Sequence, residues 1–180
     1  MNANEVLNFW FDELETKQWF TKDEALDREI ARRFGGLFEA AGRCELWGWR
    51  ETPQGRLAEV IVLDQFSRNI HRDTPRAFAN DPLSLALAQE AVARGADREL
   101  AAGPQRAFLY MPYMHSESAL IHQQAMVLFD QPELADNLEF ERRHKAIIDR
   151  FGRYPHRNAI LGRRSTEEEL AFLQQPGSSF

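Results

Sequence analysis

Leu57-Ala-Glu-Val60-Ile61-Val-Leu63-Asp64-Gln65-Phe66-Ser-Arg68-Asn69 is the stretch of sequence that decides the fold. At 100° per residue its apolar side chains cover two sides of a helix, and Asp64 and Arg68 continue the inner side. Thr52-Pro53 precedes it as a capping residue and a first-turn proline, so the helix is predicted to run from there to about Asn69. A helix that is apolar on two sides is buried, which predicts a core built around it.

The rest of the chain carries the same kind of helical signal, and no stretch alternates as a strand would. Two predicted helices follow the capping boxes Thr21-Lys-Asp-Glu24 and Ser165-Thr-Glu-Glu168. Another starts at Asp81-Pro82 and stops at Gly95. Three more cover Pro104–Tyr113, with a break at Pro112, Ser116–Phe129 and Pro132–Arg150. We therefore predict an all-α fold of about eight helices in antiparallel pairs, without a sheet.

Length and composition predict one domain over residues 1–180. Hydrophobic residues make up 43% of the chain, enough for a core, and only residues 174–180 are expected to form a disordered tail. A net charge of −6 argues against nucleic-acid binding. The chain has no basic, apolar leader and no run of about 18 apolar residues, so a cytoplasmic protein away from membranes is expected. Cys44 is the one cysteine, which excludes an internal disulfide.

The C-terminal part carries charge of the opposite sign. Between Arg142 and Arg164, seven arginines and Lys145 face one acid, Asp149, a local balance of +7. Such a segment either binds an anion or is neutralised by acids from elsewhere in the fold, and Asp64 and Glu117 are candidates for that second role.

Within this basic segment, Gly152 suits a left-handed helix end and Pro155 prevents the helix from resuming. His156-Arg157-Asn158 is therefore expected on a loop, where Arg153 and Arg157 could bind a carboxylate or phosphate. The alternative is that these arginines bond helix carbonyls and acids of the protein itself.

Polar residues on the central helix allow the same two interpretations. Asp64 and Arg68 stand four residues apart and can pair directly. In one interpretation they form a structural ion pair, while Gln65 and Asn69 fix neighbouring loops. In the other, all four residues belong to a ligand-binding cluster.

Histidines give weaker signals. His115 and His122 are seven residues apart, which predicts one face of a helix. Three adjacent residues cannot form a Ser-His-Glu triad at His115-Ser116-Glu117, because their side chains diverge. His144 is predicted to point into the core. Glu141-Arg-Arg-His144 matches one element of a di-iron bundle, but no second copy exists, so we predict no metal site.

Four motifs in order resemble the bacterial family called domain of unknown function 924, over nearly the whole chain. They are Leu63-Asp-Gln-Phe-Ser-Arg-Asn-Ile-His-Arg72, Thr74-Pro-Arg-Ala-Phe-Ala79, Phe108-Leu-Tyr-Met-Pro-Tyr-Met-His-Ser-Glu117 and Arg150-Phe-Gly-Arg-Tyr-Pro-His-Arg-Asn-Ala-Ile-Leu-Gly-Arg163. The resemblance implies a tetratricopeptide-like helical fold and signature polar positions at Asp64, Gln65, Arg68, Asn69, Arg76, His115, Ser116, Glu117, Arg153, His156, Arg157 and Asn158. It implies no activity and no cofactor.

Three functions follow as hypotheses. The first is a cleft for a small anionic or zwitterionic metabolite, with His115, Glu117 and His156 as proton-transfer groups and with ligand contacts from Asp64, Gln65, Arg68, Asn69, Ser116, Arg153, Arg157 and Asn158. The second is an interaction module for a protein partner or a second copy, anchored by tryptophans such as Trp10, Trp19, Trp47 and Trp49. In the third, the motif residues form a purely structural buried ion-pair network. The sequence leaves open whether the protein is an enzyme.

Overall fold

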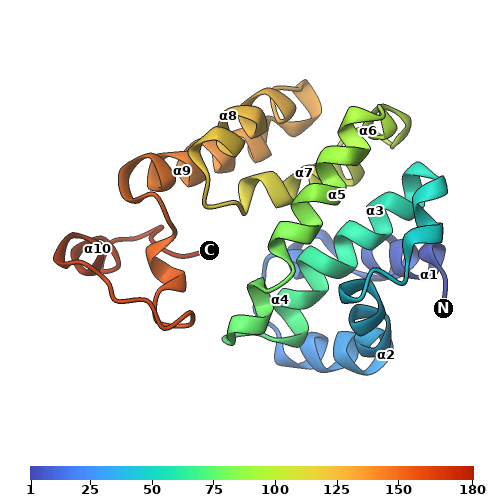
Figure 1. The fold of residues 1–180 in the computed structure, drawn as a ribbon, viewed down its shortest axis with the longest axis horizontal. Coiled ribbons are helices and arrows are strands. Elements are labelled where there is room, and N and C mark those ends of the chain that lie inside the picture. The colour runs from blue at the N-terminus through green and yellow to red at the C-terminus, as the bar shows by residue number, and fades with distance from the viewer.

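The computed structural model describes residues 1–180 as a chain of helices without a strand, which confirms the predicted all-α class (Figure 1). The tetratricopeptide-like pairing of the helices stays a prediction. The α-helices are α1 (Ala3–Asn8), α2 (Glu24–Gly42), α3 (Pro53–Ile61), α4 (Ser67–Ile70), α5 (Asp81–Ala93), α6 (Ala96–Glu99), α7 (Pro104–Met114), α8 (Ala119–Leu128), α9 (Ala135–Phe151) and α10 (Glu167–Phe172). No helix is both long and apolar enough to cross a membrane.

The predicted central helix forms one continuous rod. It consists of α3, a single π-helical turn over Val62–Phe66, and α4. Every residue from Leu57 to Ser67 is buried, as the two-sided apolar pattern predicts. The rod lies among the other helices, and α3 packs on α1, α5 and α7 (Figure 1). This position places Asp64 in the middle of the protein.

Capping residues set the helix starts, and two of them differ from the prediction. The Thr52 side chain accepts the backbone N–H of Gly55 at 3.1 Å, as expected before Pro53. The cap of α2 is Asp23, not Thr21, because the Asp23 carboxylate reaches the first free N–H groups of that helix. The capping box of α10 is likewise shifted by one residue, to Thr166 and Glu169.

Aromatic side chains fill the core around the rod. Phe66 contacts Phe9, Phe34 and Trp10, with ring centroids 4.8–6.1 Å apart. Trp10 is 1% exposed and packs on Phe108. Trp10 is therefore not the exposed anchor that the interaction hypothesis considered, because its ring is part of the core.

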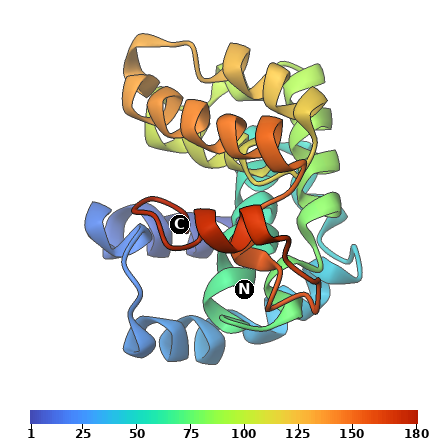
Figure 2. The same cartoon turned by 90° about the vertical axis from the view of Figure 1, so that its left-hand side faces the viewer.

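Helices α7, α8 and α9 form a layer at one end of the molecule (Figure 2). Pro112 does not break α7, which continues to Met114. The chain then leaves the helix, and α8 begins at Ala119 instead of Ser116. The prediction that His115 and His122 share one helix face is wrong, because this turn separates them.

The C-terminal segment runs beside α9 and α4 (Figures 1 and 2). Gly152 ends α9 with φ +70°, the left-handed conformation predicted for it. A short 3-10 turn, Pro155–Arg157, follows, so the loop predicted after Pro155 is partly helical. This geometry turns the basic motif back toward the central rod.

Candidate functional site

Five side chains from four parts of the fold form a continuous row that we term the mixed-charge cluster: His115, Asp64, Arg68, Asp81 and Arg157. His115 Nδ1 lies 2.8 Å from Asp64 Oδ1, and Arg68 Nη1 lies 3.3 Å from the same carboxylate oxygen. Arg68 also donates two hydrogen bonds of 3.0 Å to Asp81. Asp81 Oδ2 in turn lies 3.5 Å from Arg157 Nη1. The sequence motifs that carry these residues therefore converge in space.

The Asp64–His115 pair has a defined proton arrangement. Burial alone would raise the pKa of Asp64, but the charges of Arg68 and His115 hold it below the usual range. Burial lowers the pKa of His115, against the attraction of Asp64. A carboxylate can only accept, so the neutral imidazole donates from Nδ1 and leaves Nε2 as a free base. His115 Nε2 has no hydrogen-bond partner in the protein, and the His115 side chain is 15% exposed.

Arg157 is held between two aromatic rings. Its guanidinium carbon lies 4.6 Å from the centroid of Phe78 and 4.7 Å from that of Tyr154. The residue is 5% exposed, and its Nε is buried without a partner. Burial and the charge of Arg68 lower the pKa of Arg157. The stacking fixes the plane of the guanidinium, while its hydrogen-bond donors stay largely unused.

Glu117 joins the turn after α7 to the C-terminal segment. Its carboxylate accepts two hydrogen bonds from Arg163, at 2.6 and 2.8 Å, and a third from the backbone N–H of Tyr154. Although burial would raise the pKa of Glu117, the bonds from Arg163 lower it. Asn158 supports the same junction, because its Oδ1 accepts from Arg163 and its Nδ2 donates to Ser165. The prediction that Glu117 neutralises part of the basic segment is confirmed.

The other predicted ligand-binding residues have protein partners as well. Gln65 donates to Asp64 at 2.6 Å and so stands behind the cluster. Asn69 lies apart from it and donates to Asp27. Arg153 also lies apart, with two donors on Glu169, whose pKa it lowers to about 2. Ser116 contributes its backbone carbonyl oxygen, which accepts from His122.

Tyr154 stands at the centre of a group of histidines. Its hydroxyl donates to the Met114 carbonyl, and its ring centroid lies 5.7–6.3 Å from those of His122, His144 and His156. Burial and Arg157 lower the pKa of His156 to about 4, and His156 Nδ1 is buried without a partner. Burial raises the pKa of the Tyr154 phenol.

The Glu141-x-x-His144 element does not converge on one point. Glu141 pairs with His122 Nδ1 at 2.6 Å, while His144 Nδ1 donates to the Phe140 carbonyl of its own helix at 2.7 Å. His144 is 6% exposed, which confirms its predicted place in the core. The two residues therefore serve different neighbours.

Sequence reasoning missed three residues of the site. Asp81 was interpreted as a helix start, and Phe78 and Tyr154 were not singled out. Asp81 does open α5, but its carboxylate faces Arg68 and Arg157 instead of capping the helix. Phe78 and Tyr154 lie inside the quoted motifs, and a search for aromatic neighbours of the arginines could have found them.

The comparisons with known proteins agree on one family. The family model described as "Bacterial protein of unknown function (DUF924)" matches residues 6–177. The chain belongs to this family. It is also similar to the solved structure of "Protein of Unknown Function ATU0120 from Agrobacterium tumefaciens", with 40% identity, a TM-score of 0.90 and 96% of each chain covered. Among curated proteins no relative is found.

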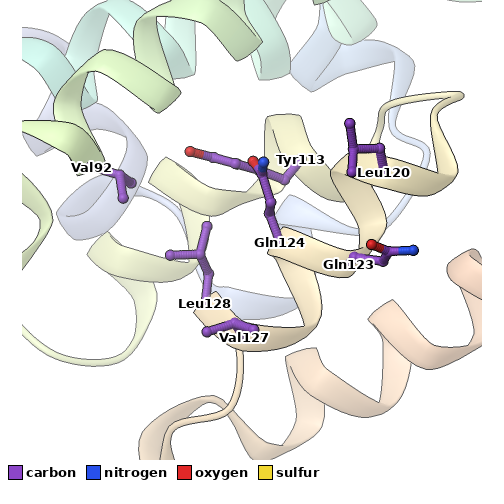
Figure 3. Close-up of a pocket in the computed structure, with 7 residues that line it drawn as sticks. All are labelled: Val92, Tyr113, Leu120, Gln123, Gln124, Val127 and Leu128. Atoms are coloured by element: carbon purple, nitrogen blue, oxygen red, sulfur yellow. The ribbon is translucent and has the colours of Figure 1, made fainter.

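In this DUF924 member a pocket lies away from the mixed-charge cluster. It is a groove of about 380 Å³ where α5, α7 and α8 meet (Figure 3). Its lining residues are Val92, Tyr113, Leu120, Gln123, Gln124, Val127 and Leu128. The groove is mostly apolar, so its chemistry differs from that of the cluster.

Proposed function

We propose that this protein binds a small anionic or zwitterionic molecule at the mixed-charge cluster and that His115 exchanges a proton with it. One observation carries the proposal: Arg157 is 5% exposed, yet its nearest acidic partner, Asp81, is 3.5 Å away and its Nε has no partner. Buried guanidinium groups are normally well paired, because unpaired donors lose their hydration. The unused N–H donors of Arg157 therefore support the proposal that it binds an oxygen atom of a ligand.

The proton role falls to His115. Its Nδ1–H is bound by Asp64, its Nε2 is free, and its lowered pKa keeps it unprotonated at neutral pH. A positioned neutral imidazole is a general base. Glu117, predicted for the same role, has its two oxygens engaged by Arg163 and Tyr154. We therefore assign Glu117 the role of holding the site together.

Thermal unfolding tests the binding proposal with inorganic phosphate, succinate and glutamate as probes. A probe at 100 times its dissociation constant stabilises a protein by about 2.7 kcal/mol, which corresponds to roughly 5–10 °C for a chain of this size. Arg157→Lys, which removes the planar fork of donors, should abolish the shift. Arg142→Lys, an exposed arginine of the same basic segment paired with Glu139, is the matched control and should keep it.

Two results would overturn the proposal. One is that none of the probes shifts the melting temperature of the wild type. The other is that Arg157→Lys and Arg142→Lys respond alike. Early melting of Arg157→Lys without any ligand effect would instead favour the structural ion-pair network.

Calorimetry in buffers of different ionisation enthalpy tests the proton exchange. The wild type should exchange a proton when a probe binds. His115→Asn keeps a donor for Asp64 and lacks the free ring nitrogen, so it should bind the probe without that exchange. Equal proton exchange in the two proteins would remove His115 from the proposal.

A second candidate function concerns the face of α8. Residues 119–128 contain no Asp, Glu, Lys or Arg, and Leu120 and Val127 are 63% and 74% exposed on the rim of the apolar groove (Figure 3). Since each chain carries a net charge of −6, an uncharged face avoids like-charge repulsion between two copies. In a two-fold dimer, the exposed side chains of each copy can enter the groove of the other. We therefore propose a second copy of this chain as the occupant.

Sedimentation velocity tests this association. The wild type should form a dimer at micromolar concentration, and Leu120→Glu should be a monomer. Leu170→Glu, which changes an exposed leucine on α10, is the control and should stay dimeric. A monomeric wild type up to 100 micromolar, or a dimer unaffected by Leu120→Glu, would refute the second candidate.

A further inference from the structure

The Phe180 side chain packs against three rings near the mixed-charge cluster. The centroid of the Phe180 ring lies 3.7 Å from that of His144, 4.6 Å from that of His156 and 5.2 Å from that of Tyr154. We term these three residues the aromatic receptacle. They come from α9 and from the loop after it, and the chain end returns to them past α10 (Figure 1).

The receptacle is a fixed part of the structure. Tyr154 is completely buried, and its hydroxyl donates to the Met114 carbonyl. His144 is held by its bond to the Phe140 carbonyl. His156 follows Pro155 in a short helical turn. These side chains therefore present a preformed surface for a flat ring, at little cost in conformational entropy.

The receptacle adjoins the donors that the proposed function uses. The ring of Tyr154 contacts Phe180 and also the guanidinium of Arg157, 4.7 Å from its centroid. Arg157, Arg163 and Arg68 all lie close enough to His156 to lower its pKa. Arg163 and Arg68 are already paired with Glu117 and Asp81, so Arg157, whose Nε has no partner, is the donor available to a carboxylate.

The contact of Phe180 is easily reversed. The residue remains 55% exposed, so one side of the ring faces solvent. The nearest anchor of the tail is Ser178, whose hydroxyl donates to the Leu173 carbonyl at 3.1 Å. Gly177, with φ +78°, provides the bend before it. Ser179 and Phe180 can therefore leave the receptacle without disturbing the core.

We propose that the aromatic receptacle binds a small aromatic carboxylate and that Phe180 occupies it as an internal competitor while no ligand is present. This inference rests on the proposed function and narrows its ligand class. The ring of the ligand replaces that of Phe180, and its carboxylate lies toward Arg157. The Phe180 side chain then leaves the receptacle when the ligand binds.

Calorimetric titration with 3-phenylpropanoate tests the proposal, since this molecule combines the ring and methylene of the Phe180 side chain with a carboxylate. Phe180→Ala keeps the backbone and removes the ring. It should bind 3-phenylpropanoate about fivefold tighter than the wild type, because the fraction of open sites rises. Leu170→Ala, which removes an equally exposed side chain of α10 outside the receptacle, should bind as the wild type does.

Two further probes separate this proposal from the proposed function. Propanoate has no ring, so its affinity should be equal in Phe180→Ala and the wild type. In ring-proton NMR spectra of Phe180→Ala, 3-phenylpropanoate should shift the His144 and His156 signals. The neutral analogue 3-phenylpropanol should bind more weakly than the acid, and Arg157→Lys should abolish that difference.

The results that overturn the proposal are distinct. Equal affinities of Phe180→Ala and the wild type for 3-phenylpropanoate would show that Phe180 does not compete. Tighter binding of propanoate by Phe180→Ala would show that the ring is irrelevant. If 3-phenylpropanol binds as well as the acid, the carboxylate part fails together with the proposed function, and the receptacle takes neutral rings.

Discussion

Replacing His144 by asparagine should make the protein less sensitive to mild acid. His144 is 6% exposed, and burial lowers its pKa from 6.5 to about 3. In the unfolded chain the imidazole returns to about 6.5. Below that pH the unfolded chain binds a proton that the folded protein binds only near pH 3. Stability is therefore complete above the unfolded pKa and falls as the pH falls toward the folded pKa.

The size of the effect follows from this window. Each unit by which the pH falls inside this window lowers the free energy of unfolding by up to about 1.4 kcal/mol. Integrated from pH 7 to pH 5, the loss due to His144 is about 2 kcal/mol. Asparagine keeps an N–H donor for the Phe140 carbonyl and does not titrate. His144→Asn should thus be less stable at pH 7, yet lose about 2 kcal/mol less than the wild type on going to pH 5.

Urea unfolding followed by circular dichroism at pH 8, 7, 6 and 5 measures the difference. Between pH 8 and 7 the free energies of unfolding of the two proteins should change in parallel, which is an internal control. The buried His156 remains in both proteins, so its contribution cancels. Equal losses between pH 7 and 5 would refute the reasoning, because His144 would then titrate alike in the folded and unfolded states.

Three other changes have effects that the structure specifies. Gly55→Ala should lower the free energy of unfolding by roughly 3 kcal/mol, because a Cβ there would overlap a backbone carbonyl of the preceding turn. Gly36 lies on an open helix surface, so Gly36→Ala should raise the free energy of unfolding by about 0.5–1 kcal/mol in the same urea assay. Glu117→Ala should cost about 2 kcal/mol in thermal or urea unfolding, since it leaves an arginine and a backbone N–H unpaired; a loss no larger than that of the exposed Glu133→Ala would contradict this role. Glu169→Gln should remove the stability that the wild type loses as the pH falls from 4.5 toward 2; an unchanged acid unfolding curve would show that the bond from Arg153 does not set this pKa.

Local signals in the sequence predicted most of the helical framework. Thr52-Pro53 and Gly95 mark helix ends through their own side-chain and backbone preferences, and the structure follows them. The caps at Asp23 and Thr166 were misplaced by one or two residues, because several neighbouring residues can cap and the packing of the helix decides between them. The turn between α7 and α8 was missed because Ser116 is compatible with a helix.

The candidate site was predictable as a set of motifs but not as a geometry. Charge pairing within one helix, as for Asp64 and Arg68, can be inferred from a spacing of four residues. The pairing of Arg68 with Asp81, and the stacking of Arg157 on Phe78, depend on how separate segments fold back, which spacing does not specify. Arg153 was predicted to bind a ligand, but its donors bind Glu169, a residue on another segment that spacing does not identify.

The π-helical turn at Val62–Phe66 rotates the side chains of α4 about the rod axis relative to those of α3. A π turn holds one residue more than an α turn, so everything after it is rotated by about 100° relative to an uninterrupted helix. Loss of a single residue there would leave a regular helix and keep the core stretch before it in place, while Arg68 would point away from Asp81. The number of residues in the π turn therefore sets the orientation of the cluster residues relative to the core. A deletion of one residue there would separate Arg68 from Asp81 in a protein that still folds.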